Sequence, residues 1–314
     1  MKIKRAVYAI LKYIFGILFI VLIIRYINVK DLSAIINPEY GYLFLAFVAT
    51  IFAFFLDSFR WKILTDEIAN RKVCSLLSYF RVYIRCVSLG QFVSQSGSLL
   101  VLRPLIMKKH YDLSYRKAYV SLFIEKVADL YFVFIFIVIF LINYIFDKYL
   151  IISIVIILPL SFFVYYRHAE IFERLSFYLL IKLNKIRKKE IQPIDLADIK
   201  NFHSFKLVGL LSASRIFIYS LRFFLIAEAL SLSISYKHIL LGMPVAQLSL
   251  IFAFTPGALG VLEAGWAGVL GIFEFSNKVI GNFILGFRFY WLIFSFLIYV
   301  LSYLPIGSKS KLKA

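Results

Sequence analysis

The stretch Thr255-Pro256-Gly257-Ala258-Leu259-Gly260-Val261-Leu262-Glu263 interrupts apolar sequence with a Pro-Gly pair and a further glycine, and it closes on an acid. A related stretch stands 160 residues earlier, as Gln95-Ser96-Gly97-Ser98-Leu99-Leu100-Val101-Leu102-Arg103. The first glycine, two leucines and the valine coincide, and Arg103 takes the place of Glu263. Two interrupted hydrophobic segments at corresponding places in two halves of a chain are typical of the transport site of a membrane protein.

The rest of the chain has the composition of a membrane protein. Hydrophobic residues make up 62% of it and aromatic residues 18%, whereas a soluble domain is about 45–50% apolar. Apolar runs long enough to cross a bilayer recur from end to end, which a soluble core cannot accommodate. We therefore predict an all-α polytopic membrane protein, with long runs at 6–27, 40–59, 118–142, 149–166, 207–230 and 280–304.

Two further apolar regions, 76–102 and 239–274, are interrupted by Gly, Pro, Ser and Gln. Segments 60–85 and 103–117, which flank residues 86–102 of the first region, are both rich in Lys and Arg, which mark cytoplasmic loops. A region that enters and leaves on one side is re-entrant. We predict six full spans plus two re-entrant regions, arranged as an inverted repeat with both termini cytoplasmic. The alternative is eight spans, in which each broken region crosses once.

The formal net charge is +19, and the positive charge lies in the loops between the apolar runs. This distribution indicates membrane topology and gives no reason to expect a nucleic-acid partner. We predict one integral membrane domain over 1–314, with a first half at 1–166 and a second half at 207–314. The basic segment 167–206 between them is predicted to be a solvated cytoplasmic connector, or alternatively a contact for anionic lipid head groups.

Ionisable side chains inside the apolar regions are the candidate functional residues. Each costs about 2.5–3.5 kcal/mol at the centre of a bilayer, so they are expected to face one another or a hydrated interior. The set consists of Arg103, Glu125, Asp129, Arg215, Arg222, Glu263 and Arg288. Asp57 and Arg60 are expected at a membrane edge, and no function is assigned to them.

Spacing suggests roles within this set. Glu125 and Asp129 are four residues apart and share a helix face. Arg215 and Arg222 lie two turns apart, and with Arg288 they are predicted to bind a lipid phosphate, because guanidinium groups offer several planar donors. The alternative is that the arginines pair with acids and hold helices together.

The two matched stretches are predicted to act as paired turns that gate the site. Their candidate residues are Gly97, Arg103, Pro256, Gly257, Gly260 and Glu263. A helix predicted over 258–273 would direct its positive N-terminal dipole at an anion. The simpler alternative is a Pro-Gly kink.

These residues also resemble a known family. Pro256-Gly257-Ala258-Leu259-Gly260-Val261-Leu262-Glu263 resembles the P-G-G-L-G-V-x-E signature of the lysylphosphatidylglycerol synthase transmembrane-region family, the flippase-like domain proteins. Arg103 followed by Glu125-Lys126-Val127-Ala128-Asp129 resembles that family's first-half pattern, an arginine after a glycine-containing turn and then E-R-x-x-D. Here Gln95 and Ser96 stand in a turn that is usually proline-rich, and Lys126 replaces the arginine. The resemblance covers essentially the whole chain.

The resemblance implies a protein of the bacterial cytoplasmic membrane that handles amphiphiles. In two-domain members this region moves aminoacylated phosphatidylglycerol between leaflets, and a separate cytoplasmic domain makes that lipid. Because the chain stops at Ala314, we expect a stand-alone member. A lysyltransferase label would be inherited from the name of the family, so we do not expect that activity of this chain.

The expected function is that of a lipid translocase for an anionic or aminoacylated phospholipid or a lipid-linked glycan. Membrane lipids are the expected partners, and no cofactor, metal or catalytic residue is assigned. One alternative is a membrane-embedded glycosyl- or phospho-transferase in which Glu125, Asp129 or Glu263 acts as the base. Another is a non-transporting accessory subunit of a lipid-modifying enzyme.

Overall fold

The computed structural model describes residues 33–92, 95–146, 150–168, 204–252 and 255–303. All the regular elements in these segments are helices, as predicted. The long helices are α3 (Tyr40–Ala69), α6 (Tyr115–Phe146), α9 (Ser204–Ala229) and α12 (Asn277–Leu301), and α7 (Leu150–Arg167) and the short α2 (Ser33–Ile36) accompany them. The predicted span at 6–27 and nearly all of the connector at 167–206 lie outside the described residues.

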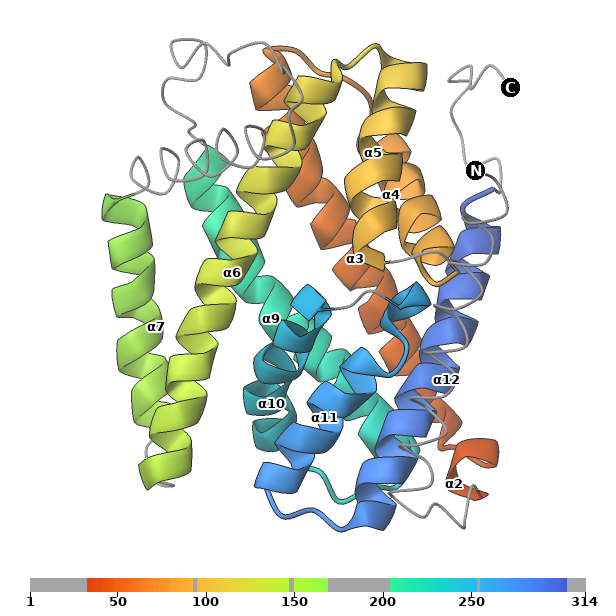
Figure 1. The fold of residues 1–314 in the computed structure, drawn as a ribbon, viewed down its shortest axis with the longest axis vertical. Helices are drawn as coiled ribbons and strands as arrows, with labels where there is room; N and C mark the ends of the chain where they lie inside the picture. Colours follow the sequence, from red (N-terminus) through yellow and green to blue (C-terminus); the bar gives the residue numbers. More distant parts are fainter. Residues whose placement is uncertain (1–32, 93–94, 147–149, 169–203, 253–254, 304–314) are drawn as a thin grey trace, which may run out of the picture. The chain divides into compact units, whose positions relative to one another are not determined.

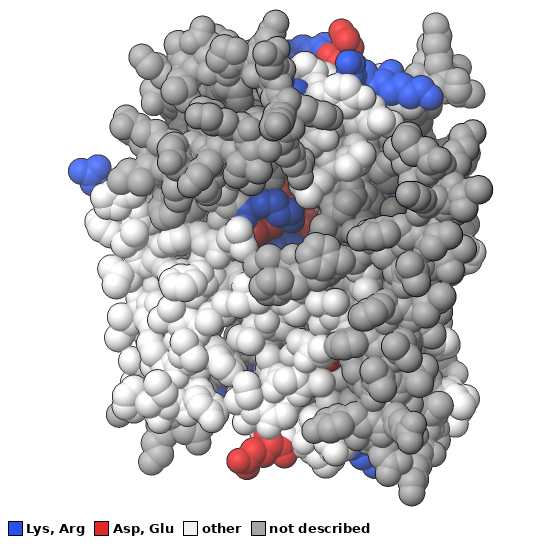
Figure 2. Space-filling view, in the orientation of Figure 1, with Lys and Arg blue, Asp and Glu red and all other residues white. Residues whose placement is uncertain are grey.

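Helices α3, α6, α9 and α12 are long and apolar enough to cross a membrane, with 25 to 32 residues each. About 20 residues suffice at a rise of 1.5 Å per residue. Large apolar side chains remain exposed along the helices, among them Phe134, Phe163 and Phe296, which are 63–66% exposed. Most of the described surface in Figure 2 is correspondingly uncharged. An apolar surface on this scale is stable against lipid, so the chain is a multi-pass membrane protein.

The first broken region forms a helical hairpin from α4 (Leu76–Gly90) and α5 (Gln95–Tyr111). The Ser98 hydroxyl on α5 donates to the Cys86 carbonyl on α4 at 2.8 Å. At the other end, the Arg71 guanidinium before α4 donates to the carbonyls of Tyr111 and Asp112 after α5, at 3.3 and 3.0 Å. The region therefore begins and ends in one place, which favours the re-entrant alternative over a single crossing.

The second broken region has the same plan, with α10 (Tyr236–Leu248), the 3₁₀ turns η2 (Ser249–Phe252) and η3 (Pro256–Ala258), and α11 (Val261–Ile272). The ring of His238 lies 4.8 Å from that of Phe273, so the ends of this hairpin also meet. Glycines permit the close packing further in, because a Cβ at Gly242 would lie 2.6 Å from Val269 and one at Gly265 would lie 2.7 Å from the Ala246 carbonyl.

The tips of the two hairpins touch. Gly257 has φ +57°, and a Cβ placed there would lie 2.8 Å from the carbonyl oxygen of Gln91, just after α4. Only glycine tolerates both the backbone conformation and this approach. In contrast, the matched Gly97 lies within the first turn of α5. The two stretches that resemble each other in sequence thus differ in local structure.

The chain divides into two compact units that interleave in sequence. The first unit contains residues 1–54, 84–99 and 216–306, and the second contains 55–83, 100–215 and 307–314. Each unit draws on both predicted halves of the chain. The first holds the second hairpin and the tip of the first hairpin. The predicted division into halves at 1–166 and 207–314, and their inverted relation, stay predictions.

Candidate functional site

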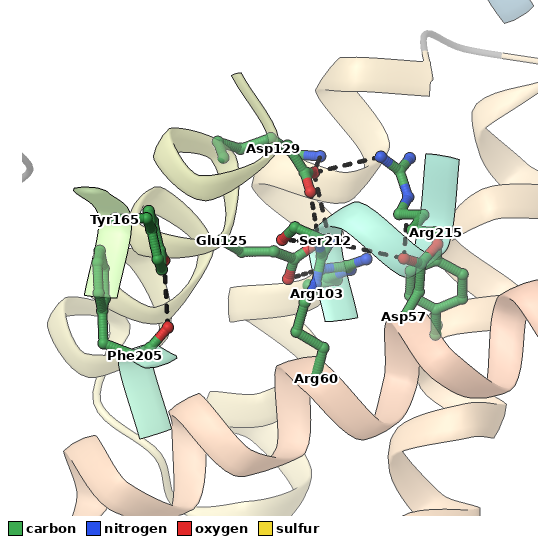
Figure 3. Close-up of polar contacts among 11 residues, drawn as sticks. Asp57, Arg60, Arg103, Glu125, Asp129, Tyr165, Phe205, Ser212 and Arg215 are labelled. Carbon is green, nitrogen blue, oxygen red and sulfur yellow. Dashed lines mark hydrogen bonds and ion pairs between the residues drawn. The ribbon is translucent and has the colours of Figure 1, made fainter. Parts of the chain in front are cut away.

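The second unit contains a network of buried ionised side chains, which Figure 3 shows pointing toward one another. Four helices contribute to it: α3, α5, α6 and α9. Three carboxylates and four cationic side chains take part in its ion pairs, namely Asp57, Glu125 and Asp129 with Arg60, Arg103, Lys126 and Arg215.

Arg60 on α3 contacts all three carboxylates. Its Nη2 donates to Glu125 at 2.9 Å, its Nη1 donates to Asp129, and it lies 3.5 Å from Asp57. Nη1 also donates to the Ser212 hydroxyl on α9 at 2.7 Å. Arg60 is 1% exposed. A buried guanidinium is tolerated only where carboxylates and hydrogen bonds compensate for lost hydration, as they do here.

Arg103 reaches the same network from α5. Its Nη1 donates to the second oxygen of Glu125 at 3.1 Å, so Glu125 is held between two arginines. The Arg103 guanidinium also lies over the rings of Trp61 and Tyr83, 4.8 and 4.5 Å from their centroids. Aromatic faces stabilise a cation in a site with little water.

One end of the network is open to the surroundings. Arg215 on α9 pairs with Asp57 at 3.0 Å and with Asp129 at 3.5 Å, and its side chain is 17% exposed. Lys126 donates to Asp129 at 3.3 Å and is 41% exposed. The charged groups of Asp57, Arg60, Arg103 and Glu125 lie at the closed end, at 1–2% exposure.

The first unit holds a separate buried ion pair, at the tip of the second hairpin. Arg288 on α12 donates through Nε to Glu263 at 2.5 Å and through Nη1 to the Gly257 carbonyl at 3.1 Å. The other oxygen of Glu263 accepts the Gly260 N–H at 2.9 Å. Glu263 therefore caps the N-terminus of its own helix, where a carboxylate also meets the positive end of the helix dipole.

Arg222 on α9 is buried in the first unit among aromatic rings. Its guanidinium lies 4.4 Å from the ring centroids of Phe223 and Trp291 and 4.7 Å from that of Tyr219. The predicted phosphate ligands thus have different neighbours: aromatic rings for Arg222, Asp57 and Asp129 for Arg215, and Glu263 for Arg288. A phosphate site shared by all three arginines stays a prediction.

The structure differs from expectation in three details. Asp57 and Arg60, to which the sequence analysis assigned no role, are buried at 2% and 1% exposure within α3 and belong to the network. Their spacing of three residues was a usable signal, because it puts opposite charges on one helix face. The predicted helix 258–273 begins at Val261, and Glu263 occupies its N-terminus. Arg103 lies inside α5 rather than on a turn.

The fold and the buried charges define a class: a multi-pass helical membrane protein with two broken helical hairpins and ionised side chains in its apolar segments. The comparison with protein families identifies the family within this class. A family model described as "Lysylphosphatidylglycerol synthase TM region" matches residues 9–298, so the chain belongs to that family, as its motifs predicted. Comparisons with curated proteins and with solved structures find no match.

Proposed function

We propose that this protein is a lipid translocase of the bacterial cytoplasmic membrane. Its cargo would be an anionic or aminoacylated phospholipid, or a lipid-linked glycan. The head group would cross the bilayer along ionised side chains of the protein while the acyl chains remain in lipid. Family membership supports a membrane role, and the buried charges on apolar helices support contact with a polar group at membrane depth.

The observation that carries the proposal is the Arg288–Glu263 pair where the two hairpin tips meet. A guanidinium and a helix N-terminus both favour an anion, and here the carboxylate of Glu263 fills that place. A lipid phosphodiester carries the same single negative charge and also offers two acceptor oxygens, so it can replace the carboxylate on Arg288. The exchange would loosen the cap of α11 and open the contact between the tips.

The other sequence-predicted residues would serve this cycle. Arg215 and Arg222 would bind phosphate along α9. Arg103 would act with Glu263 in gating by changing partners, and Glu125 and Asp129 would balance the arginines or a cationic part of the cargo. The re-entrant hairpins would form an inverted repeat with one hairpin entering from each side.

Reconstitution in liposomes tests the proposal. Labelled phosphatidylglycerol and lysylphosphatidylglycerol are placed in one leaflet, and their appearance in the other is followed by chemical quenching. We expect wild-type protein to accelerate the exchange. R288Q is expected to reduce the rate at least tenfold, because it removes a charge-assisted contact made during transfer.

K278Q is the matched control, since Lys278 is an exposed cation on the same helix. It should translocate at the wild-type rate. Equal rates for liposomes with and without protein, over the panel of anionic lipids, would overturn the proposal. Equal rates for R288Q and wild type would remove Arg288 from the mechanism.

A further inference from the structure

The open end of the buried network shares one carboxylate among three cations. Asp129 is contacted by Arg60 from within the network, by Arg215 from α9 and by Lys126 from its own helix. Its hydrogen bonds to Arg60 involve both carboxylate oxygens. Arg60 is the most deeply buried of the three cations, so losing its ion pair with Asp129 would cost the most free energy.

Lys126 is left with little compensating charge. Its described ion pair is with Asp129 alone, at 3.3 Å, on the oxygen that Arg215 also approaches at 3.5 Å. Lys126 nevertheless lies within α6, a candidate membrane span. A cation within a membrane span is costly unless an anion accompanies it. The side chain is also 41% exposed, so an anion from outside the protein can reach it.

The geometry suits a tetrahedral oxyanion. Lys126 Nζ and Arg215 Nη1 lie near the same oxygen atom of Asp129, so they are close enough for one phosphate group to contact both. Arg215 supplies a planar fork of donors and Lys126 supplies a compact point charge. Figure 2 shows basic and acidic side chains together near the middle of the drawn face.

We propose that Lys126 and Arg215 form a binding site for the phosphodiester of an anionic phospholipid, with Asp129 as the internal competitor for the same donors. This inference deepens the proposed function, because it identifies the chemical group that is recognised and adds Lys126 to its ligands. When the phosphodiester binds, Arg215 and Lys126 turn from Asp129 to the lipid. Asp129 then pairs with Arg60 alone. The negative charge of the phosphodiester brings the net charge at the open end of the network closer to zero.

Ligand-dependent stabilisation of the full chain in detergent tests the site. A ligand that binds the native state raises the melting temperature in a concentration-dependent way. The probes are short-chain phosphatidylglycerol, diacylglycerol with the same acyl chains, and inorganic phosphate. The quantity compared is the concentration that gives half of the maximal rise, so a change in the stability of a variant does not obscure it.

We expect phosphatidylglycerol to stabilise the wild type saturably and diacylglycerol not to. K126Q should weaken phosphatidylglycerol binding about tenfold, the size of one charge-assisted contact. K126R should bind as wild type, and D129N should bind more tightly because the competitor is gone. K62Q is the matched control, since Lys62 is part-exposed and pairs with an aspartate of its own helix outside the network.

Inorganic phosphate separates the two sources of the group. If it displaces the lipid, the site recognises phosphate in either form, and if it has no effect, the site is for the lipid. Equal affinities of K126Q, K62Q and wild type would overturn the inference, as would equal stabilisation by diacylglycerol. If the protein binds phosphatidylglycerol but does not translocate it, the proposed translocase function is refuted and this site is not. If the protein translocates the lipid and K126Q binds it as tightly as wild type, this site is refuted and the translocase function is not.

Discussion

Arg60 shows how a single residue can join several helices within an apolar setting. It lies on α3 and contacts Glu125 and Asp129 on α6 and Ser212 on α9. Each contact compensates part of the free energy needed to bury a guanidinium. Each of the three carboxylates is buried as well and pairs with Arg60. Loss of one partner therefore costs more than the formation of the pair contributes.

We predict that R60Q destabilises the protein by about 3–5 kcal/mol, the cost of leaving buried charges without their partner. Unfolding in detergent, followed by circular dichroism, measures the difference. K62Q, two residues along the same helix, should change stability by about 0–1 kcal/mol because its ion pair with Asp66 is partly exposed. Similar stabilities of R60Q and K62Q would show that the network does not hold the second unit together.

At the scale of elements, the broken hairpins depend on glycine at points of close approach. Gly257 is unusual because it combines a left-handed backbone with the carbonyl of Gln91 at contact distance. The same turn offers its own carbonyl to Arg288. The conformation of Gly257 thus determines both how the hairpin tips meet and where Arg288 finds an acceptor.

We predict that G257A destabilises the fold by about 1–3 kcal/mol, because a side chain at this φ is strained and its Cβ has no room. The variant should also lose translocation in liposomes. G268A is the matched control: Gly268 lies in α11, and a Cβ there would meet nothing within 4 Å. It should be neutral, or more stable by about 0.5–1 kcal/mol, because alanine favours the helix interior. A G257A variant as stable and active as G268A would contradict the tip contact.

At the scale of the whole molecule, the two hairpins bear on the membrane topology. Both hairpins begin and end in one place, as the contacts of Arg71 with Tyr111 and of His238 with Phe273 show. A helix pair with this geometry returns to the side from which it started. We therefore predict that the chain crosses the membrane fewer times than its apolar regions suggest.

Accessibility labelling tests this prediction. In a background in which Cys74 and Cys86 are replaced by serine, single cysteines are placed at Lys72 and Lys109, which flank the first hairpin. An impermeant maleimide should label both from the same side of the membrane. Cysteines at Ser233 and Lys278, which flank the second hairpin, should be labelled together from the opposite side. Labelling of Lys72 and Lys109 from different sides would establish a crossing in place of a hairpin.

The long helices could be predicted because their signal is local. The run 118–142 became α6 (Tyr115–Phe146) and the run 207–230 became α9 (Ser204–Ala229), since transfer of an apolar segment into lipid depends on its own side chains. The two interruptions were located for the same reason, because glycine, proline and polar residues weaken a helix wherever it packs. The family followed from the motifs around Glu263 and Glu125, and the family match confirmed it.

The pairing of charges was decided by tertiary structure alone. The sequence indicated that buried ions must meet counterions but not which ones, and it missed Asp57 and Arg60 because they seemed to end an apolar run. Their ion-pair partners on other helices lie 65 to 158 residues away. An ion pair depends on which helices are neighbours and on how each helix is rotated about its axis. Hydropathy is a property of each segment by itself, so it contains neither piece of information.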